Sequence, residues 1–252
     1  MIEVEGIVTR FDAQTVHDGV GFQVAPGSLV ALIGGSGTGK SVLLREMIGL
    51  HRPSAGTVRL LGTSLWEAAP AELDAVRRRF GMMFQDGALF SSLTVAQNVA
   101  VPLHEHTRLA PVTIDALVSL RLLQAGLPVA AGAKKPSELS GGMRKRAAIA
   151  RAIALEPEVL FLDEPTSGLD PITARAFDRL LRSLVDDLGI TVFIVTHDLD
   201  TLLGVVDRLI VLSAGRVLAD GPVREVMALD DPWLRDYFSV RHTTGIDSAH
   251  GI

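Results

Sequence analysis

The segment that most constrains the fold is a glycine-rich stretch, residues 34–41, which reads GGSGTGKS. It follows an apolar run at 29–33 and opens a segment with a helical pattern at 40–50, so the chain must turn sharply from a strand into a helix. Glycines let the backbone N–H groups of such a turn point inward, and the helix N-terminus adds a positive dipole end. The stretch fits the pattern G-x-x-x-x-G-K-[ST] in its proper context, which predicts a phosphate-binding loop.

Two residues of this loop are candidates for phosphate chemistry. Lys40 is expected to reach the β- and γ-phosphates of a nucleotide, and Ser41 is expected to bind Mg²⁺. The metal also needs a distant carboxylate, and the apolar run 159–162 ends in Asp163 and Glu164. We expect Asp163 to hold Mg²⁺ through water and Glu164 to orient or deprotonate the attacking water. An acidic pair at a strand end can also merely cap the next helix, but the glycine-rich loop favours the catalytic interpretation.

Short apolar runs alternate with longer helical segments along much of the chain. The runs are rich in β-branched residues and apolar throughout, which is typical of parallel strands covered on both faces. This alternation predicts a layered α/β domain. The expected strands are 29–33, 159–162, 191–195 and 209–212, and the expected helices are 40–50, 142–155 and 174–188.

Three parts of the chain depart from this alternation. Residues 2–11 and 15–24 have the pattern of two antiparallel strands separated by a short turn. Residues 86–140 have a helical pattern, which we interpret as a helical insertion in the α/β core. The prolines expected to interrupt it are Pro102, Pro111, Pro128 and Pro136. Beyond about residue 230 the pattern weakens, which predicts a frayed tail.

Composition excludes several classes of protein. The longest unbroken apolar run is 29–33, whereas a membrane-spanning helix needs about 20 mainly apolar residues. The first ten residues carry Glu3 and Glu5 and are not expected to form a signal peptide. With no cysteine, the chain has no disulfide or thiolate metal site. The net charge of −5 disfavours nucleic acid as a partner.

A further motif, LSGG at 139–142, precedes a basic helical segment and lies about twenty residues before the acidic pair. Its glycines at a helix N-terminus make a second anion site. Together with the loop and the acidic pair, the motifs resemble those of the ATP-binding cassette (ABC) ATPases over roughly residues 2–228. The other features that carry this resemblance are Phe11 near the N-terminus, Gln85 after a short apolar run, SGLD at 167–170, and His197 in VTHD.

The resemblance implies an α/β fold of the P-loop NTPase ABC ATPase type. It has a RecA-like core with an N-terminal antiparallel β subdomain and a helical insertion. The nucleotide-binding core would then comprise residues 1–85 and 156–229, and the helical subdomain with the LSGG signature would comprise residues 86–155. Residues 230–252 would form a C-terminal tail that could dock on a partner.

The resemblance also implies ATP and Mg²⁺ as ligands and a head-to-tail homodimer that encloses two ATP molecules. Ser140 and Gly142 would bind the γ-phosphate of ATP held by the second copy, and Asp170 would cross the interface. His197 would contact the γ-phosphate, and Gln85 would contact the metal or the water. The implied catalytic residues are Glu164, His197, Gln85 and Lys40, and the implied metal ligands are Ser41, Gln85 and Asp163. The implied nucleotide contacts are Phe11, Gly34, Gly35, Ser36, Gly37, Thr38, Gly39, Lys40, Ser41, Ser140, Gly141, Gly142 and Asp170.

A departure from the common LSGGQ signature narrows the resemblance to one group within the ABC ATPases. Met143 stands where glutamine is usual, and LSGGM followed by RKRAAIARAIALEPE is similar to the ATPase subunit of Mla/Mce-type phospholipid transporters. Residues 84–90, 98–106 and 170–172 share that similarity. It implies a peripheral ATPase at the cytoplasmic face of the inner membrane. The ATPase would power phospholipid transport through integral-membrane permease subunits, with an Mce-domain lipid-binding protein as a further partner.

Several alternatives stay open. The chain could serve another ABC importer or exporter, with amino acid, metal or lipoprotein cargo. A soluble ABC protein of translation or DNA repair is disfavoured by the single cassette, the absence of a heptad run and the acidic net charge. The histidines at 104 and 106 are interpreted as part of a solvated or partner-facing loop, not a metal site. The aromatic cluster Trp233, Tyr237 and Phe238 either seals its helix onto its own domain or docks on a partner ATPase.

Overall fold

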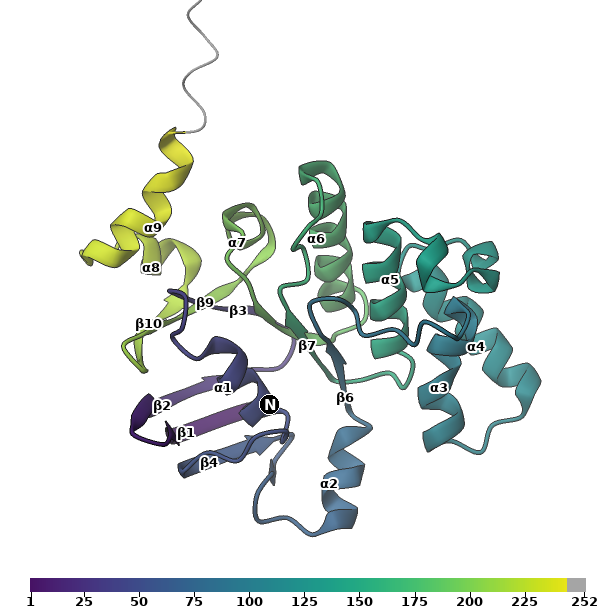
Figure 1. Ribbon diagram of the computed structural model, residues 1–252, viewed down its shortest axis with the longest axis horizontal. Coiled ribbons are helices and arrows are strands. Elements are labelled where there is room, and N and C mark those ends of the chain that lie inside the picture. Colours follow the sequence, from purple (N-terminus) through teal and green to yellow (C-terminus); the bar gives the residue numbers. More distant parts are fainter. Residues whose placement is uncertain (244–252) are drawn as a thin grey trace, which may run out of the picture.

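The computed structural model describes residues 1–243, and within them two β-sheets form the frame (Figure 1). The larger sheet has the strand order β10-β9-β3-β8-β7-β6. Its neighbouring strands from β9 to β6 run parallel, and β10 pairs antiparallel with β9. The bounds are β3 Leu29–Gly34, β6 Phe80–Met83, β7 Val159–Asp163, β8 Thr191–Val195, β9 Arg208–Ser213 and β10 Arg216–Pro222.

The smaller sheet is antiparallel, with the order β2-β1-β4-β5. Its strands are β1 Ile2–Phe11, β2 Gln14–Val24, β4 Ala55–Leu60 and β5 Thr63–Ser64. The α-helices are α1 Lys40–Met47, α2 Pro70–Arg77, α3 Val95–His106, α4 Pro111–Gln124, α5 Gly141–Ala152, α6 Pro171–Asp186, α7 Leu199–Val205, α8 Val223–Met227 and α9 Pro232–Thr243. Two 3₁₀ turns, Val129–Ala133 and Pro136–Glu138, lie between α4 and α5.

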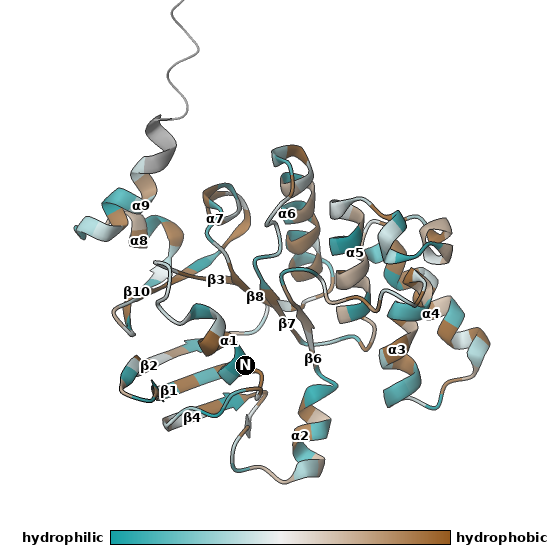
Figure 2. Cartoon of the chain, in the orientation of Figure 1, coloured by the Kyte–Doolittle hydropathy of each residue, from teal (hydrophilic) through white to brown (hydrophobic). Residues whose placement is uncertain are grey.

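The larger sheet is buried on both faces, which explains why its strands are apolar at consecutive positions. In β3, Ala31 and Ile33 belong to a core shared with α3, α5 and α6, whereas Val30 and Leu32 belong to a second core shared with α1 and the smaller sheet. Side chains alternate between the faces of a strand, so both sets must be apolar. Figure 2 shows these central strands in brown, between helices whose outer faces are more hydrophilic.

Helices α3, α4 and α5 lie together on one side of the larger sheet, beyond its β6 edge (Figure 1). The segment before α3 is held by Asn98, which is fully buried and accepts from the Phe90 amide at 2.7 Å. The Asn98 side-chain amide also donates to the carbonyls of Phe90 and Thr94. Thr94 caps α3 by accepting from the Gln97 amide, and this capping fixes where the helix begins.

All four expected strands of the larger sheet are present, and so is the predicted hairpin of the smaller sheet. The interruption expected at Pro102 is wrong, because this residue lies inside α3. Pro111 instead begins α4, where its missing N–H costs no helical hydrogen bond. The frayed tail is also wrong for Pro232–Thr243, which forms α9, while 244–252 lie outside the described residues. Among residues 1–243, no helix combines the length and apolar character needed to span a membrane.

Candidate active site

The glycine-rich loop joins the end of β3 to the start of α1, as the sequence predicts. Gly37 and Gly39 have φ of 77° and 90°, a left-handed conformation that favours glycine. Gly34 lies against the backbone of β9, where an added Cβ would collide with the Leu212 carbonyl. The ammonium group of Lys40 donates to the carbonyl oxygens of Gly34 and Gly35, each at 2.8 Å. The loop is therefore a tight turn, and the Lys40 side chain folds back along the loop backbone.

The acidic pair ends β7, which is separated from β3 by β8 alone. The Ser41 hydroxyl lies near the Asp163 carboxyl group and favours its ionised form. Burial raises the pKa of Asp163, and the neighbouring Glu164 charge adds to this effect, while Ser41, Arg45 and Lys40 oppose it. Burial lowers the pKa of Lys40, against the charges of Glu164 and Asp163. The two strand ends thus bring these ionisable groups together.

The residues fit a bound magnesium ion. Ser41 and Asp163 offer a hydroxyl and a carboxylate oxygen, the hard ligands that Mg²⁺ takes together with water and phosphate oxygens. A cation would also relieve the electrostatic cost of ionising a half-buried acid beside Glu164. The side chain of Gln85 hydrogen-bonds instead to the Ser167 hydroxyl at 3.4 Å. Within residues 1–243 no hydrogen bond joins Gln85 to Ser41 or Asp163, so its expected metal contact stays a prediction.

Glu164 and His197 lie side by side at the ends of β7 and β8. The His197 Nδ1 is 2.9 Å from the Glu164 Oε1, and the imidazole is largely exposed whereas the carboxylate is not. Glu164 has a φ of 49°, an uncommon conformation for a residue with a side chain. Its amide donates to the Val195 carbonyl at 2.8 Å, which holds that conformation. Both residues line an open pocket of about 410 Å³ together with the 166–169 loop.

Sequence reasoning missed one residue of this region. Lys145, on α5, is 8% exposed and donates to the carbonyl oxygens of Gln85 and Glu164 at 2.9 and 3.2 Å. Burial lowers its pKa, while Asp86 and Glu164 oppose that shift. In the sequence it is the middle of a basic run, which gives no sign that it points inward. It joins two segments that flank the site.

The signature segment forms the N-terminus of α5. Ser140 is the N-cap, and its hydroxyl accepts from the Met143 amide at 3.3 Å. Gly142 lies against α6, since an added Cβ would come 2.6 Å from a methyl carbon of Thr173. Asp170 in turn caps α6 by accepting from the amides of Ile172 and Thr173. The two helix N-termini are therefore neighbours, and no hydrogen bond among the described residues joins either to the glycine-rich loop.

Phe11, the aromatic residue among the implied nucleotide contacts, lies at the end of β1. Phe11 is 44% exposed and stacks on His51, with ring centroids 5.1 Å apart and planes inclined by 24°. Residues 104–106, expected in a loop, instead form the last turn of α3 and are exposed.

Helix α9 packs against its own chain. Trp233, Tyr237 and Phe238 contact the larger core, and the first two rings stack with centroids 4.9 Å apart. Burial raises the pKa of Tyr237 to about 12, and the charges of Glu164 and Asp198 contribute. The interpretation that this cluster seals its helix onto its own domain is confirmed, and docking on a partner stays a prediction.

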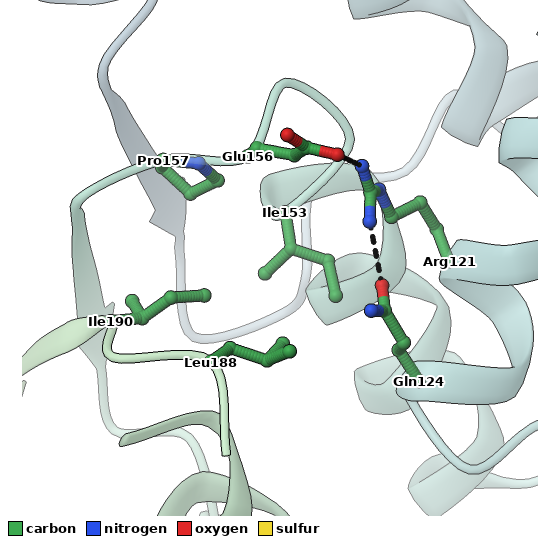
Figure 3. Close-up of a pocket in the computed structure, with 7 residues that line it drawn as sticks. All are labelled: Arg121, Gln124, Ile153, Glu156, Pro157, Leu188 and Ile190. Carbon is green, nitrogen blue, oxygen red and sulfur yellow. Dashed lines mark hydrogen bonds and ion pairs between the residues drawn. The ribbon is translucent and has the colours of Figure 1, made fainter. Parts of the chain in front are cut away.

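A second pocket, of about 230 Å³, lies at the opposite end of the strands (Figure 3). Pro157 and Ile190, which precede β7 and β8, help to line it. Arg121 of α4, 4% exposed, donates to Glu156 at 2.5 Å and to Gln124 at 2.8 Å across this pocket. Ligands of open α/β sheets bind at the carboxyl ends of the strands, so this pocket is remote from the candidate active site.

Comparison with known proteins agrees with this geometry. A family model described as ABC transporter matches residues 17–167, and one described as AAA domain, putative AbiEii toxin, Type IV TA system, matches residues 131–204. The "Probable ribonucleotide transport ATP-binding protein mkl" of Mycobacterium leprae is 38% identical over 242 residues, which is 95% of this chain and 69% of the relative. The "Intermembrane phospholipid transport system ATP-binding protein MlaF" of Escherichia coli K12 is 39% identical over 222 residues, 88% of this chain and 82% of the relative.

Among solved structures, the dimeric post-hydrolysis state of the ATP-binding cassette MJ0796 bound to ADP and Pi has a TM-score of 0.79 and 30% identity. The match covers 89% of this chain and 99% of that chain. The α/β architecture is that of such cassettes. The chain therefore belongs to the ABC transporter family, as one of its ATP-binding, ATP-hydrolysing cassettes.

Proposed function

We propose that this protein is the ATP-hydrolysing subunit of an ABC transporter that moves phospholipid through partner permease subunits. The observation that carries the ATPase role is the contact of Glu164 with His197, at strand ends next to the glycine-rich loop. The phospholipid cargo is supported by the similarity to MlaF, whose name describes intermembrane phospholipid transport. No part of this chain is expected to touch the cargo.

In the proposed complex, the adenine stacks on Phe11 and the phosphates lie on the glycine-rich loop, against the N-terminus of α1. Lys40 turns from the loop carbonyls toward the β- and γ-phosphates. Ser41 and Asp163 would hold Mg²⁺, with Gln85 as a further ligand, and the ion would offset charge on the phosphate oxygens. The loop residues in this role are Gly34, Gly35, Ser36, Gly37, Thr38, Gly39, Lys40 and Ser41.

Hydrolysis in this proposal needs a water molecule in line with the γ-phosphate. Glu164 accepts a proton from that water or orients it, and His197, held 2.9 Å from the Glu164 carboxylate, contacts the γ-phosphate. Lys40 and the helix N-termini stabilise the charge that develops in the transition state. Catalysis is therefore mainly positioning and charge stabilisation.

The proposed working unit is a head-to-tail dimer of two copies. The N-terminus of α5, with Ser140, Gly141 and Gly142, would complete the phosphate site of the other copy, and Asp170 would lie at the same interface. The dimeric cassette MJ0796, a structural neighbour, supports this arrangement. Among the described residues, the signature makes no hydrogen bond to the glycine-rich loop of its own chain. A phosphate site completed by the second copy would use both anion-binding helix ends, the N-terminus of α1 from one copy and the N-terminus of α5 from the other.

We further propose that residues 1–85 and 156–229 act as the nucleotide-binding core and residues 86–155 as the helical subdomain. A groove near Gln85 and residues 86–105 would contact the permease, with an Mce-domain lipid-binding protein as a further partner. The ATPase would be peripheral, at the cytoplasmic face of the inner membrane. Residues 230–252 would be the segment that reaches a partner.

A second cargo has its own support. The Mycobacterium leprae relative is named for ribonucleotide transport and matches 95% of this chain. The two candidates share the same ATPase chemistry and differ in what the permease carries. Purification of the membrane complex separates them: the phospholipid proposal expects bound phospholipid and ATPase activity that responds to phospholipid, whereas a response to ribonucleotides alone would favour the second candidate.

Glu164→Gln tests the catalytic assignment. It keeps the size of the side chain and removes the proton acceptor, so we expect ATP turnover to fall about 100-fold or more. ATP-bound dimers should then accumulate and be visible by size-exclusion chromatography. The matched control is Glu158→Gln, at the other end of β7, where a half-exposed pair with Arg79 is lost. Normal turnover in Glu164→Gln would refute the assignment.

Ser140→Arg tests the signature. The larger cationic side chain should abolish ATPase activity and leave ATP binding to the glycine-rich loop intact, because among the described residues Ser140 makes no hydrogen bond to the loop of its own chain. Binding is measured by titration with MgATP, and turnover by phosphate release. Loss of both binding and turnover would contradict a signature that acts on the second copy.

A further inference from the structure

A buried polar cluster lies directly behind the glycine-rich loop. It consists of Thr9 on β1, His17 on β2 and Glu46 on α1, each with no exposed surface. Three polar side chains in an otherwise apolar core are costly unless each is paired. None of them belongs to the expected set of site residues, and the catalytic proposal makes no use of them.

The cluster is closely connected. The Thr9 hydroxyl donates to Glu46 Oε1 at 2.6 Å and lies 2.9 Å from His17 Nδ1. The same Nδ1 is 3.2 Å from Glu46 Oε2, an oxygen with no other hydrogen-bond partner. On the opposite side of the ring, His17 Nε2 is 3.2 Å from the carbonyl oxygen of Gly39. One imidazole thus links the strand pair, the helix and the loop.

The partners limit which ring nitrogens carry hydrogen. A carbonyl oxygen can only accept, so Nε2 must donate to Gly39. The Thr9 hydrogen is used on Glu46, so the hydrogen between Nδ1 and Glu46 Oε2 is carried either by the ring or by the carboxyl group. In the first case His17 is an imidazolium paired with a buried carboxylate, and in the second case both groups are neutral.

The ring fits against one residue of the loop. Gly39 has a φ of 90°, and an added Cβ would collide with His17 Nε2 and lie 2.5 Å from a methyl carbon of Val16. The Gly39 carbonyl also accepts from the Leu43 amide at 2.8 Å, in the first turn of α1. Glu46 lies two turns along the same helix. His17 therefore holds α1 at its N-cap residue, Gly39, and again at its buried face.

We propose that His17, charged and paired with Glu46, is a positioning residue that holds the Gly39 carbonyl so that the loop amides point at the phosphates. The proposal rests on the proposed nucleotide site and deepens it. Thr9 and His17 are cross-strand partners in the β1–β2 register, and Phe11 lies two residues beyond Thr9. The cluster thereby also sets the spacing between the base-stacking ring and the phosphate loop.

A buried ion pair often adds little to the net free energy of unfolding of a protein. Replacing such a pair by apolar residues of similar volume is often neutral or stabilising, whereas removing one partner leaves an uncompensated charge. The test uses this difference. The triple variant Thr9→Val, His17→Leu, Glu46→Leu removes every polar group of the cluster, and we expect it to fold with a melting temperature near that of the wild type.

The readout is MgATP affinity, measured by isothermal titration. Loss of one charge-assisted hydrogen bond to the loop should weaken binding about tenfold in the triple variant. The control is Arg121→Met, which removes the buried member of an ion pair with the exposed Glu156 at the far end of the strands and should lower stability with no change in affinity. Wild-type affinity in the folded triple variant would overturn the proposal. The nucleotide site is tested separately: the wild type should bind MgATP in the same titration, and Lys40→Ala should not.

A measurement on the wild type needs no variant to fold. Nitrogen-15 NMR at neutral pH should show both ring nitrogens of His17 protonated, and addition of MgATP should shift the Nε2 resonance because Gly39 belongs to the loop. A ring protonated at one nitrogen, or an Nε2 resonance that ignores MgATP, would overturn the proposal.

Discussion

The carboxyl group of Asp178, on α6, gives the fold a pH dependence whose size can be worked out. The residue is 5% exposed, and both of its oxygens accept from the Thr201 hydroxyl, at 3.0 and 3.1 Å. Burial raises its pKa from 3.8 to about 6, and the charges of Asp198 and Asp200 add to this, while the Thr201 hydrogen bond and Arg179 oppose it. A shift of this size corresponds to about 3 kcal/mol.

The sign follows from proton counting. Between the ordinary pKa and the raised one, the folded protein holds a proton at Asp178 that the unfolded chain has lost. The stabilisation that Asp178 contributes to the folded state is therefore fully present below about pH 4. This stabilisation is lost as the pH rises toward 6. At neutral pH the free energy of unfolding is lower by the full amount of about 3 kcal/mol, because the buried carboxylate is ionised.

Asp178→Asn removes the charge and keeps an oxygen for the Thr201 hydroxyl. The new amide hydrogens of the asparagine cost about 1 kcal/mol if they stay unpaired. The free energy of unfolding at pH 7.5 should therefore exceed that of the wild type by about 2 kcal/mol. For a chain of this size that gain raises the melting temperature by about 4–8 °C. At pH 4.5, where wild-type Asp178 is protonated, the gain should nearly vanish.

Differential scanning calorimetry at the two pH values measures this difference. The matched control is Asp187→Asn, an exposed carboxyl group just beyond the C-terminus of the same helix, which should change little at either pH. An Asp178→Asn gain of equal size at pH 7.5 and pH 4.5 would refute the reasoning, because it would show that the buried charge is not its source.

Two further predictions concern the contacts around the site. Lys145→Met should lower ATP turnover about tenfold with little change in MgATP affinity, because two carbonyl groups beside the site lose a charge-assisted donor; the exposed Lys134→Met serves as control, and unchanged turnover would contradict the role. Deleting residues 230–252 removes Leu234, which is 1% exposed, from the core and should lower the melting temperature by several degrees. Unchanged dimerisation and transport in that truncated protein would remove the idea that the segment docks on a partner.

Local patterns explain which parts of the fold the sequence predicts. The glycine-rich loop and the strand before it are set by neighbours in the chain, and so is the apolar strand that ends at Asp163. Strand β6 was missed because it has only four residues and contains Gly81, a position forced by the approach of the Ala152 carbonyl from α5. Strand β10, at the sheet edge, was missed because its sequence RVLADGP has no regular alternation of polar and apolar residues and only one buried position.

The site residues divide in the same way. Motif order identifies Glu164 and His197, and the structure brings them within hydrogen-bond distance. Glu46 instead occupies a helix whose sequence shows no reason for a buried acid, and its partner Thr9 is 37 residues away. Lys145 contacts a carbonyl 60 residues away. Such long-range pairings depend on the packing of separate elements, which no local pattern encodes.

Helices α3 to α5 are joined to the rest of the chain at two places, residues 84–94 and 153–158. Two attachments define a line, and rotation about that line is the motion that stretches neither of them. The ammonium group of Lys145 crosses from this helical part to the Gln85 and Glu164 carbonyls. A rotation of these helices about that line would have to break these two hydrogen bonds, the one from Arg146 of α5 to the Ala176 carbonyl of α6, and apolar contacts with the sheet.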